Sequence, residues 1–140
     1  MANDETDRLL GKIGQLLAED TAYPLDGTLL YAQVASNMVS PSIFKKRGNT
    51  IVYRWPDLDR LGDALLDLWA AEEPAKRWEE IEYLITGDTF EVAYTYADEI
   101  DPEEDPFERR DRIVRRYFGD KPIIYPPLSS EDDGLPRYNL

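Results

Sequence analysis

Apolar residues recur every three or four positions in three stretches of the chain, which is the spacing of one face of an α-helix. The stretches cover residues 4–19, residues 58–73, which follow Asp57, and residues 106–118, which follow Asp105. Both aspartates are suitable N-caps, and Asn3 is a third candidate, at the start of the first helix. The residues expected to face inward are Leu9, Leu10, Ile13, Leu16 and Leu17; Leu58, Leu61, Leu65, Leu68 and Trp69; and Ile113, Val114, Tyr117 and Phe118.

Between the first two helices the pattern changes to alternation, which is typical of β-strands. The segment "TLLYAQVA" at 28–35 predicts one strand, and "MVSPSIFKK" at 38–46 and "TIVYRW" at 50–55 predict two more. Pro41 has no backbone N–H to donate, so its position indicates a sheet edge or a bulge.

Residues 77–98 predict a β-hairpin, because Gly87-Asp88 is a two-residue turn signal between two alternating runs. That turn would pair Ile85 with Phe90, Tyr83 with Val92, and Ile81 with Tyr94. On the other face it would pair Leu84 with Glu91, Glu82 with Ala93, and Glu80 with Thr95. We therefore expect one buried face and one exposed acidic face. The buried set is Ile81, Tyr83, Ile85, Phe90, Val92 and Tyr94, and the exposed set is Glu80, Glu82 and Glu91.

This order of elements predicts an α+β domain with a single antiparallel sheet of about five strands and two to three helices packed on one face. Residues 1–128 would form this one domain, with a segment that docks through Ile123, Ile124 and Tyr125. Residues 129–140 would form a C-terminal tail.

Charge and composition narrow the classes of partner. The formal net charge is −13 over 140 residues, which argues against nucleic acid and anionic membrane and favours a basic partner. The chain has no Cys and no His, which excludes disulfides, zinc sites built from those residues, and Ser-His or Cys-His catalysis. No window approaches the roughly 20 apolar residues of a membrane span, and a cytoplasmic location fits.

Motifs for catalysis or cofactor binding are missing from the sequence. It contains neither a phosphate-binding glycine loop nor a nucleophile elbow. Two of its 29 Asp and Glu residues could in principle act as a glycosidase pair, but no pair stands in an apolar setting that would raise a pKa. The acidic run at 98–105 lacks the glycine and the alternation of a calcium loop. We expect no catalytic residue, no cofactor and no metal, and hence a protein that is not an enzyme.

The most unusual stretch is that acidic run, which is followed by arginines on the third helix. The acids are Asp98, Glu99, Asp101, Glu103, Glu104 and Asp105, and the arginines are Arg109, Arg110, Arg112, Arg115 and Arg116. We interpret the arginines as an internal ion-pair network and the acids as a surface that faces a basic protein. The expected partner-binding residues are Asp98, Glu99, Asp101, Glu103 and Glu104, together with Glu80, Glu82 and Glu91 on the hairpin.

Several of these segments resemble the YezG-like family of small bacterial proteins, long known as a domain of unknown function. The resemblance rests on "LDRLGDALLDLW", "GDTFEVAYTYAD", and a charged helix that runs into "YFG" and "YPP", within residues 55–127. It implies an immunity protein, or antitoxin, that neutralises a cognate polymorphic toxin, with a nuclease as the expected toxin. A non-catalytic acidic adaptor or regulatory domain is the alternative, and a hydrolase that uses carboxylates alone is a third class.

Overall fold

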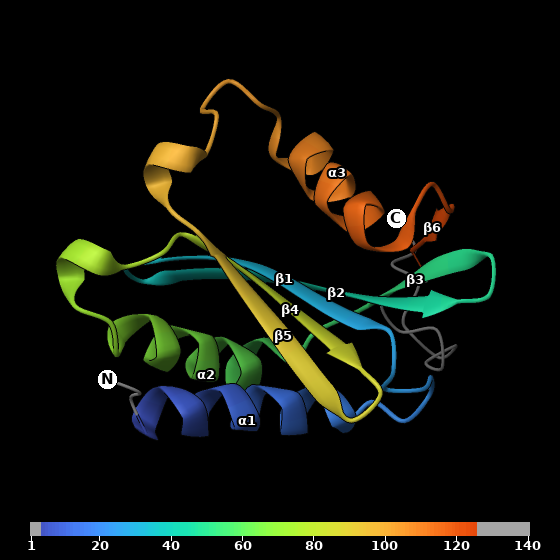
Figure 1. Ribbon diagram of the computed structural model, residues 1–140, viewed down its shortest axis with the longest axis horizontal. Helices are drawn as coiled ribbons and strands as arrows, with labels where there is room; N and C mark the ends of the chain where they lie inside the picture. The colour runs from blue at the N-terminus through green and yellow to red at the C-terminus, as the bar shows by residue number, and fades with distance from the viewer. Residues whose placement is uncertain (1–3, 126–140) are drawn as a thin grey trace, which may run out of the picture.

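The computed structural model describes residues 4–125, and it shows an α+β fold built on a single six-stranded sheet (Figure 1). The predicted fold class is confirmed. The elements in chain order are α1 (Asp4–Ala18), β1 (Thr28–Ala35), β2 (Met38–Arg47), β3 (Thr50–Arg54), α2 (Leu58–Ala70), the 3-10 turn η1 (Pro74–Lys76), β4 (Glu80–Thr86), β5 (Thr89–Thr95), the 3-10 turn η2 (Ala97–Glu99), α3 (Pro106–Phe118) and β6 (Ile123–Ile124).

The strands lie in the order β5-β4-β1-β2-β3-β6. The first five form antiparallel pairs, as expected. The sixth strand comes from the segment predicted to dock, and it pairs parallel to β3 through Ile51 with Ile123 and Val52 with Ile124. The predicted boundary at residue 128, the tail at 129–140 and the Asn3 cap lie outside the described residues.

Pro41 stands at a local edge of the sheet, as its missing N–H indicated. It pairs with Ala32 of β1 on one side. On the other side, the pairing of β2 with β3 extends only from Ile43 to Arg47, so Pro41 lies beyond the end of β3. At this position β3 offers no carbonyl to which residue 41 could donate, so the missing N–H of the proline costs no hydrogen bond to β3.

Helices α1 and α2 pack side by side on one face of the sheet (Figure 1). Leu9, Ile13 and Leu17 of α1 are buried there. The predicted stripe of α2 is correct except for its first residue. Leu58 is 61% exposed, because it is the first residue of the helix and the packed stripe begins one turn later, at Leu61.

Helix α3 lies on the opposite face of the sheet from the other two helices (Figure 1). Val114 and Phe118 of α3 pack there in a second apolar cluster with Leu29, Phe44 and Ile51. The sequence had placed two to three helices on one face; two do lie together, and the third makes the sheet the middle of three layers. β1 accordingly carries buried residues on both of its faces.

Because α3 covers the second face of the sheet, the side chains on that face of the β4-β5 hairpin are not all exposed to solvent. All the predicted pairings between β4 and β5 are present. Glu80 and Glu82, however, are only 1% and 3% exposed, so the prediction that they face solvent was wrong. Conversely Phe90, expected to be buried, is 42% exposed because it belongs to the edge strand β5. Glu91 is exposed, as predicted.

Candidate protein-binding surface

The buried Glu80 is the centre of a charged network between β4 and α3. Its carboxylate accepts hydrogen bonds from Nε and Nη2 of Arg109 at 2.9 and 2.7 Å. The Tyr31 hydroxyl donates a further bond at 2.7 Å, and the side-chain amide of Gln33 donates one at 3.3 Å. Arg109 is itself only 8% exposed. A buried charge is therefore both paired and hydrogen-bonded, which is the condition for tolerating it in a protein interior.

These contacts determine the ionisation of Glu80. Burial alone would raise the pKa of this carboxyl, but the hydrogen bonds from Arg109, Tyr31 and Gln33 outweigh burial and hold the pKa below its usual value. Burial and the neighbouring Glu80 raise the pKa of Tyr31. A general acid needs the opposite shift, a raised carboxyl pKa, so Glu80 is set up as a structural anion.

Glu82 has an equivalent role two residues further along β4. One of its oxygens lies 2.6 Å from Nη2 of Arg116. The Tyr117 hydroxyl donates a hydrogen bond to the same oxygen. Burial, with help from Glu82, raises the pKa of Tyr117 to about 12. Both hairpin glutamates therefore hold α3 against the sheet, and neither belongs to a partner-binding surface.

Glu104 joins the acidic loop, residues 98–105, to the same network. It lies 3.4 Å from Nη1 of Arg109 and 3.0 Å from Nη2 of Arg112. The hydrogen bond from Arg112 is the main reason that the pKa of Glu104 is lowered. The predicted internal network of arginines is confirmed for these contacts. Glu104 is therefore half-buried and paired within the protein.

The remaining acids of the loop project into solvent. Asp98, Glu99, Asp101 and Glu103 are exposed, and no ion pair within residues 4–125 involves any of them. Local bonds give the loop a defined shape. Glu99 accepts from the Tyr96 N–H at 2.9 Å, and Asp101 accepts from the Glu103 N–H at 2.9 Å.

The far end of the loop is fastened to α3. The Asp105 side chain accepts hydrogen bonds from the N–H groups of Phe107 and Glu108 at 3.0 and 3.1 Å, which caps the helix as predicted. Together with Glu104, this cap means that the loop is held at its end while its acidic side chains stay outside.

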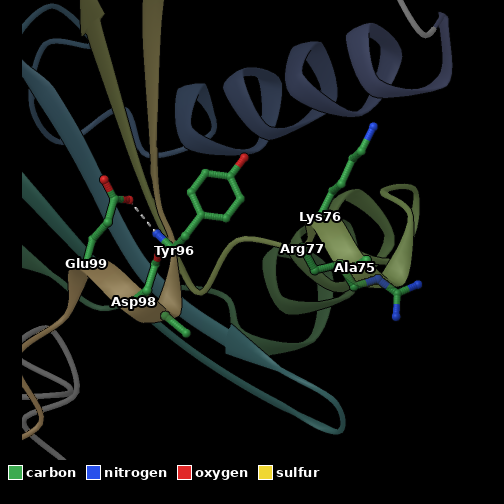
Figure 2. A pocket seen from close by; sticks show the side chains of 7 residues that line it. Ala75, Lys76, Arg77, Tyr96, Asp98 and Glu99 are labelled. Atoms are coloured by element: carbon green, nitrogen blue, oxygen red, sulfur yellow. Dashed lines mark hydrogen bonds between the residues drawn. The ribbon is translucent and has the colours of Figure 1, made fainter.

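A surface cleft of about 720 Å³ lies at the start of the loop. Figure 2 shows Tyr96, Asp98 and Glu99 on one side and Ala75, Lys76 and Arg77 of the η1 region on the other. Arg77 is fixed by a bond from its Nε to the Glu72 carbonyl at 3.2 Å. This basic side of the cleft could not be predicted from the sequence, because nothing local in the sequence brings residues 75–77 next to residues 96–99.

Other kinds of site receive no support from the described part of the chain. No group of three or more Asp or Glu side chains in residues 4–125 is arranged to hold a metal ion. None of the helices in this range is both long and apolar enough to cross a membrane.

No family model matches the chain, and no curated protein aligns with it significantly.

Proposed function

We propose that this protein is an immunity protein that binds and neutralises a basic toxin domain through the acidic loop. The observation that carries the proposal is that the acids fall into two groups. Glu80, Glu82 and Glu104 form ion pairs with arginines of α3, whereas four loop carboxylates are exposed without an ion pair in residues 4–125. The partner-binding set is therefore Asp98, Glu99, Asp101 and Glu103, with Glu91 as a further exposed acid.

Exposed charge of one sign favours fast and selective association with an oppositely charged surface. The whole chain adds to this effect, since its net charge is −13. A nuclease is the toxin class that fits best, because a cleft that holds phosphates is basic. The carboxylates would compete for that cleft with the nucleic acid.

The shape of the loop supports the same conclusion. Glu104 and Asp105 anchor one end, and local hydrogen bonds orient Glu99 and Asp101. A loop that is already ordered loses less conformational entropy when it binds. The adjacent cleft offers a recess for a side chain of the partner.

The test uses the C-terminal toxin domain encoded directly upstream of this gene. We expect co-expression of the protein to restore growth of cells that produce this domain, and the two purified proteins to bind. The test variant combines Asp98→Asn, Glu99→Gln, Asp101→Asn and Glu103→Gln. The matched control makes the same change in charge on the exposed acids of α1 and α2, with Asp7→Asn, Asp59→Asn, Asp63→Asn and Asp67→Asn.

The loop variant should fold normally and lose at least about tenfold in association rate, because steered association is much faster than neutral association. Its affinity should also depend less on salt than that of the unmodified protein. The control should lose much less. Absence of any toxin domain upstream, failure to protect, or equal losses in the two variants would contradict the proposal. An adaptor would bind such a domain, if at all, without restoring growth.

A further inference from the structure

Arg110 differs from every other arginine of α3. The other four each lie within 4 Å of a carboxylate: Arg109 with Glu80 and Glu104, Arg112 with Glu104, Arg115 with Asp120, and Arg116 with Glu82. Within residues 4–125, Arg110 has no such ion pair. Its Nη1 donates to the Ser42 hydroxyl at 3.1 Å and its Nη2 to the Tyr125 hydroxyl at 3.2 Å. Its Nε is buried without a hydrogen-bond partner in the same part of the chain.

Aromatic rings surround this guanidinium. Its central carbon lies 5.3 Å from the ring centre of Phe107 and 5.5 Å from that of Phe44. The rings of Tyr125 and Tyr53 are at 5.7 and 5.8 Å. Cation–π contacts of this kind stabilise the charge without neutralising it. The arginine is thereby held in place, while Nη1 and Nη2 each keep a second N–H beyond the ones given to Ser42 and Tyr125.

The same rings continue into an aromatic patch, which we define as the exposed Trp55, Phe107 and Tyr125 together with the half-buried Arg110 and the buried Tyr53. Tyr53 connects its parts, because its ring centre lies 5.1 Å from that of Trp55 and 5.3 Å from that of Tyr125. Phe107 is 68%, Trp55 50% and Tyr125 47% exposed. Exposed and contiguous apolar surface of this kind marks an interaction site more often than isolated apolar residues do.

A small hollow of about 120 Å³ opens beside Arg110 and Phe107. The hydroxyl-bearing residues Ser40, Ser42 and Tyr31 also line it. The Tyr31 hydroxyl already donates its proton to Glu80. The hollow therefore combines one unpaired cation with the hydroxyls of Ser40 and Ser42, which is the chemistry that recognises a carboxylate.

We propose that the aromatic patch is the anchoring centre of the toxin interface, and that Arg110 receives a carboxylate from the toxin domain in the hollow. This inference rests on the proposed function. Interfaces are anchored by a few Trp, Tyr and Arg residues in a water-excluded centre, surrounded by a polar rim. The patch supplies such a centre, and the acidic loop, which ends two residues before Phe107, supplies the rim.

Charge complementarity makes a basic partner the occupant of this surface. A second copy of the chain would bring another net charge of −13 against the same acidic loop. Two such surfaces repel each other. A basic toxin surface is attracted by the loop, and a single acidic side chain within that surface would meet the guanidinium of Arg110, which has no ion pair within residues 4–125.

The experiment measures affinity for the upstream toxin domain with Phe107→Ala, Arg110→Lys and Arg110→Ala. Leu58→Ala is the control for Phe107, since both are strongly exposed apolar residues near a helix start. Arg115→Ala is the control for Arg110 on the same helix, because it loses only an exposed pair. Thermal unfolding checks that each variant folds. Arg110→Lys keeps the positive charge and most of the side-chain packing, both of which Arg110→Ala removes. It loses only the planar guanidinium, which can bind a carboxylate through two parallel hydrogen bonds.

We expect Phe107→Ala and Arg110→Ala each to weaken binding by about 30-fold or more, the loss typical of an anchoring residue. Arg110→Lys should also weaken binding, while both controls stay within a factor of about three of the unmodified protein, as peripheral contacts do. Toxin binding should shift the fluorescence of Trp55 to shorter wavelength, as judged against Trp55→Phe.

The outcomes separate the two proposals. If the unmodified protein binds the toxin domain and the patch variants bind equally well, the aromatic patch is not the anchor, and the immunity function stands. If the unmodified protein neither protects nor binds, the immunity function fails, and the inference fails with it. If the Trp55 signal responds to removal of residues 126–140 but not to the toxin domain, the chain's own C-terminal segment occupies the patch, which also overturns the inference.

Discussion

Replacing Arg109 with methionine tests whether the buried ion pair holds α3 on the sheet. In the native protein Arg109 donates three hydrogen bonds to Glu80, which is 1% exposed. Without the guanidinium, Glu80 keeps only the donors of Tyr31 and Gln33 and becomes an uncompensated buried anion. Breaking a buried pair in this way costs about 3–5 kcal/mol. That is a large part of the roughly 5–15 kcal/mol that stabilises an ordinary domain.

The assay is urea and thermal unfolding of Arg109→Met beside Arg112→Met. We expect Arg109→Met to lower the melting temperature by roughly 10–20 °C, from the cost of the broken pair and the size of the chain. Arg112 contacts the same loop residue, Glu104, but its side chain is 55% exposed. Its replacement should therefore cost less than about 1 kcal/mol.

A double variant completes the test. Adding Glu80→Met to Arg109→Met removes the unpaired buried carboxylate and replaces the ion pair by two apolar side chains. It should recover most of the lost stability, since such replacements are often close to neutral. Equal and small losses for Arg109→Met and Arg112→Met would refute the reasoning, and so would a double variant less stable than Arg109→Met alone.

Two further predictions concern α1 and acid stability. Gly14→Ala should destabilise the protein by about 1–3 kcal/mol in urea unfolding, because the added Cβ would lie 2.7 Å from the Tyr83 hydroxyl. Gly11→Ala is the control: its Cβ would meet nothing within 4 Å, so it should be neutral or stabilise the protein by up to about 1 kcal/mol. The folded pKa of Glu80 is below its ordinary value of 4.5, so the stability that it contributes is present above that pH and is lost as pH falls through the folded pKa. The urea midpoint should therefore fall below about pH 4.5, and less steeply in the Glu80→Met, Arg109→Met double variant; identical acid profiles for the two proteins would contradict this assignment.

Helix starts and the hairpin register were predictable because both are decided by residues close together in the sequence. Asp57 accepts a hydrogen bond from the Arg60 N–H at 3.1 Å, and Asp105 caps α3 in the same manner. Gly87 adopts the positive φ of 62° that the turn requires. A two-residue turn then fixes which residues of β4 and β5 are opposite one another.

The side of the sheet that α3 covers was not predictable in the same way. Alternation shows which residues share a face, but it does not show what packs against that face. Glu80 and Glu82 were therefore interpreted as solvent-facing, since an isolated acidic face is normally exposed. One signal was available: β1 is apolar on both faces, which is typical of a strand covered on both sides.

For the candidate surface, the sequence by itself determined that the protein is acidic and that its acids concentrate in residues 98–105 before a capped helix. Only the tertiary structure decided which acids stay free. Arg109 pairs with Glu80 and Arg116 with Glu82, which lie 29 and 34 residues away in the sequence, a separation that no local pattern encodes. Arg112 pairs with the nearer Glu104. Arg110 is left among aromatic rings from β2, from β3 and from Tyr125, the residue after β6. The reason is physical: composition sets the number of charges, whereas the packing of α3 against the sheet sets which of them find partners.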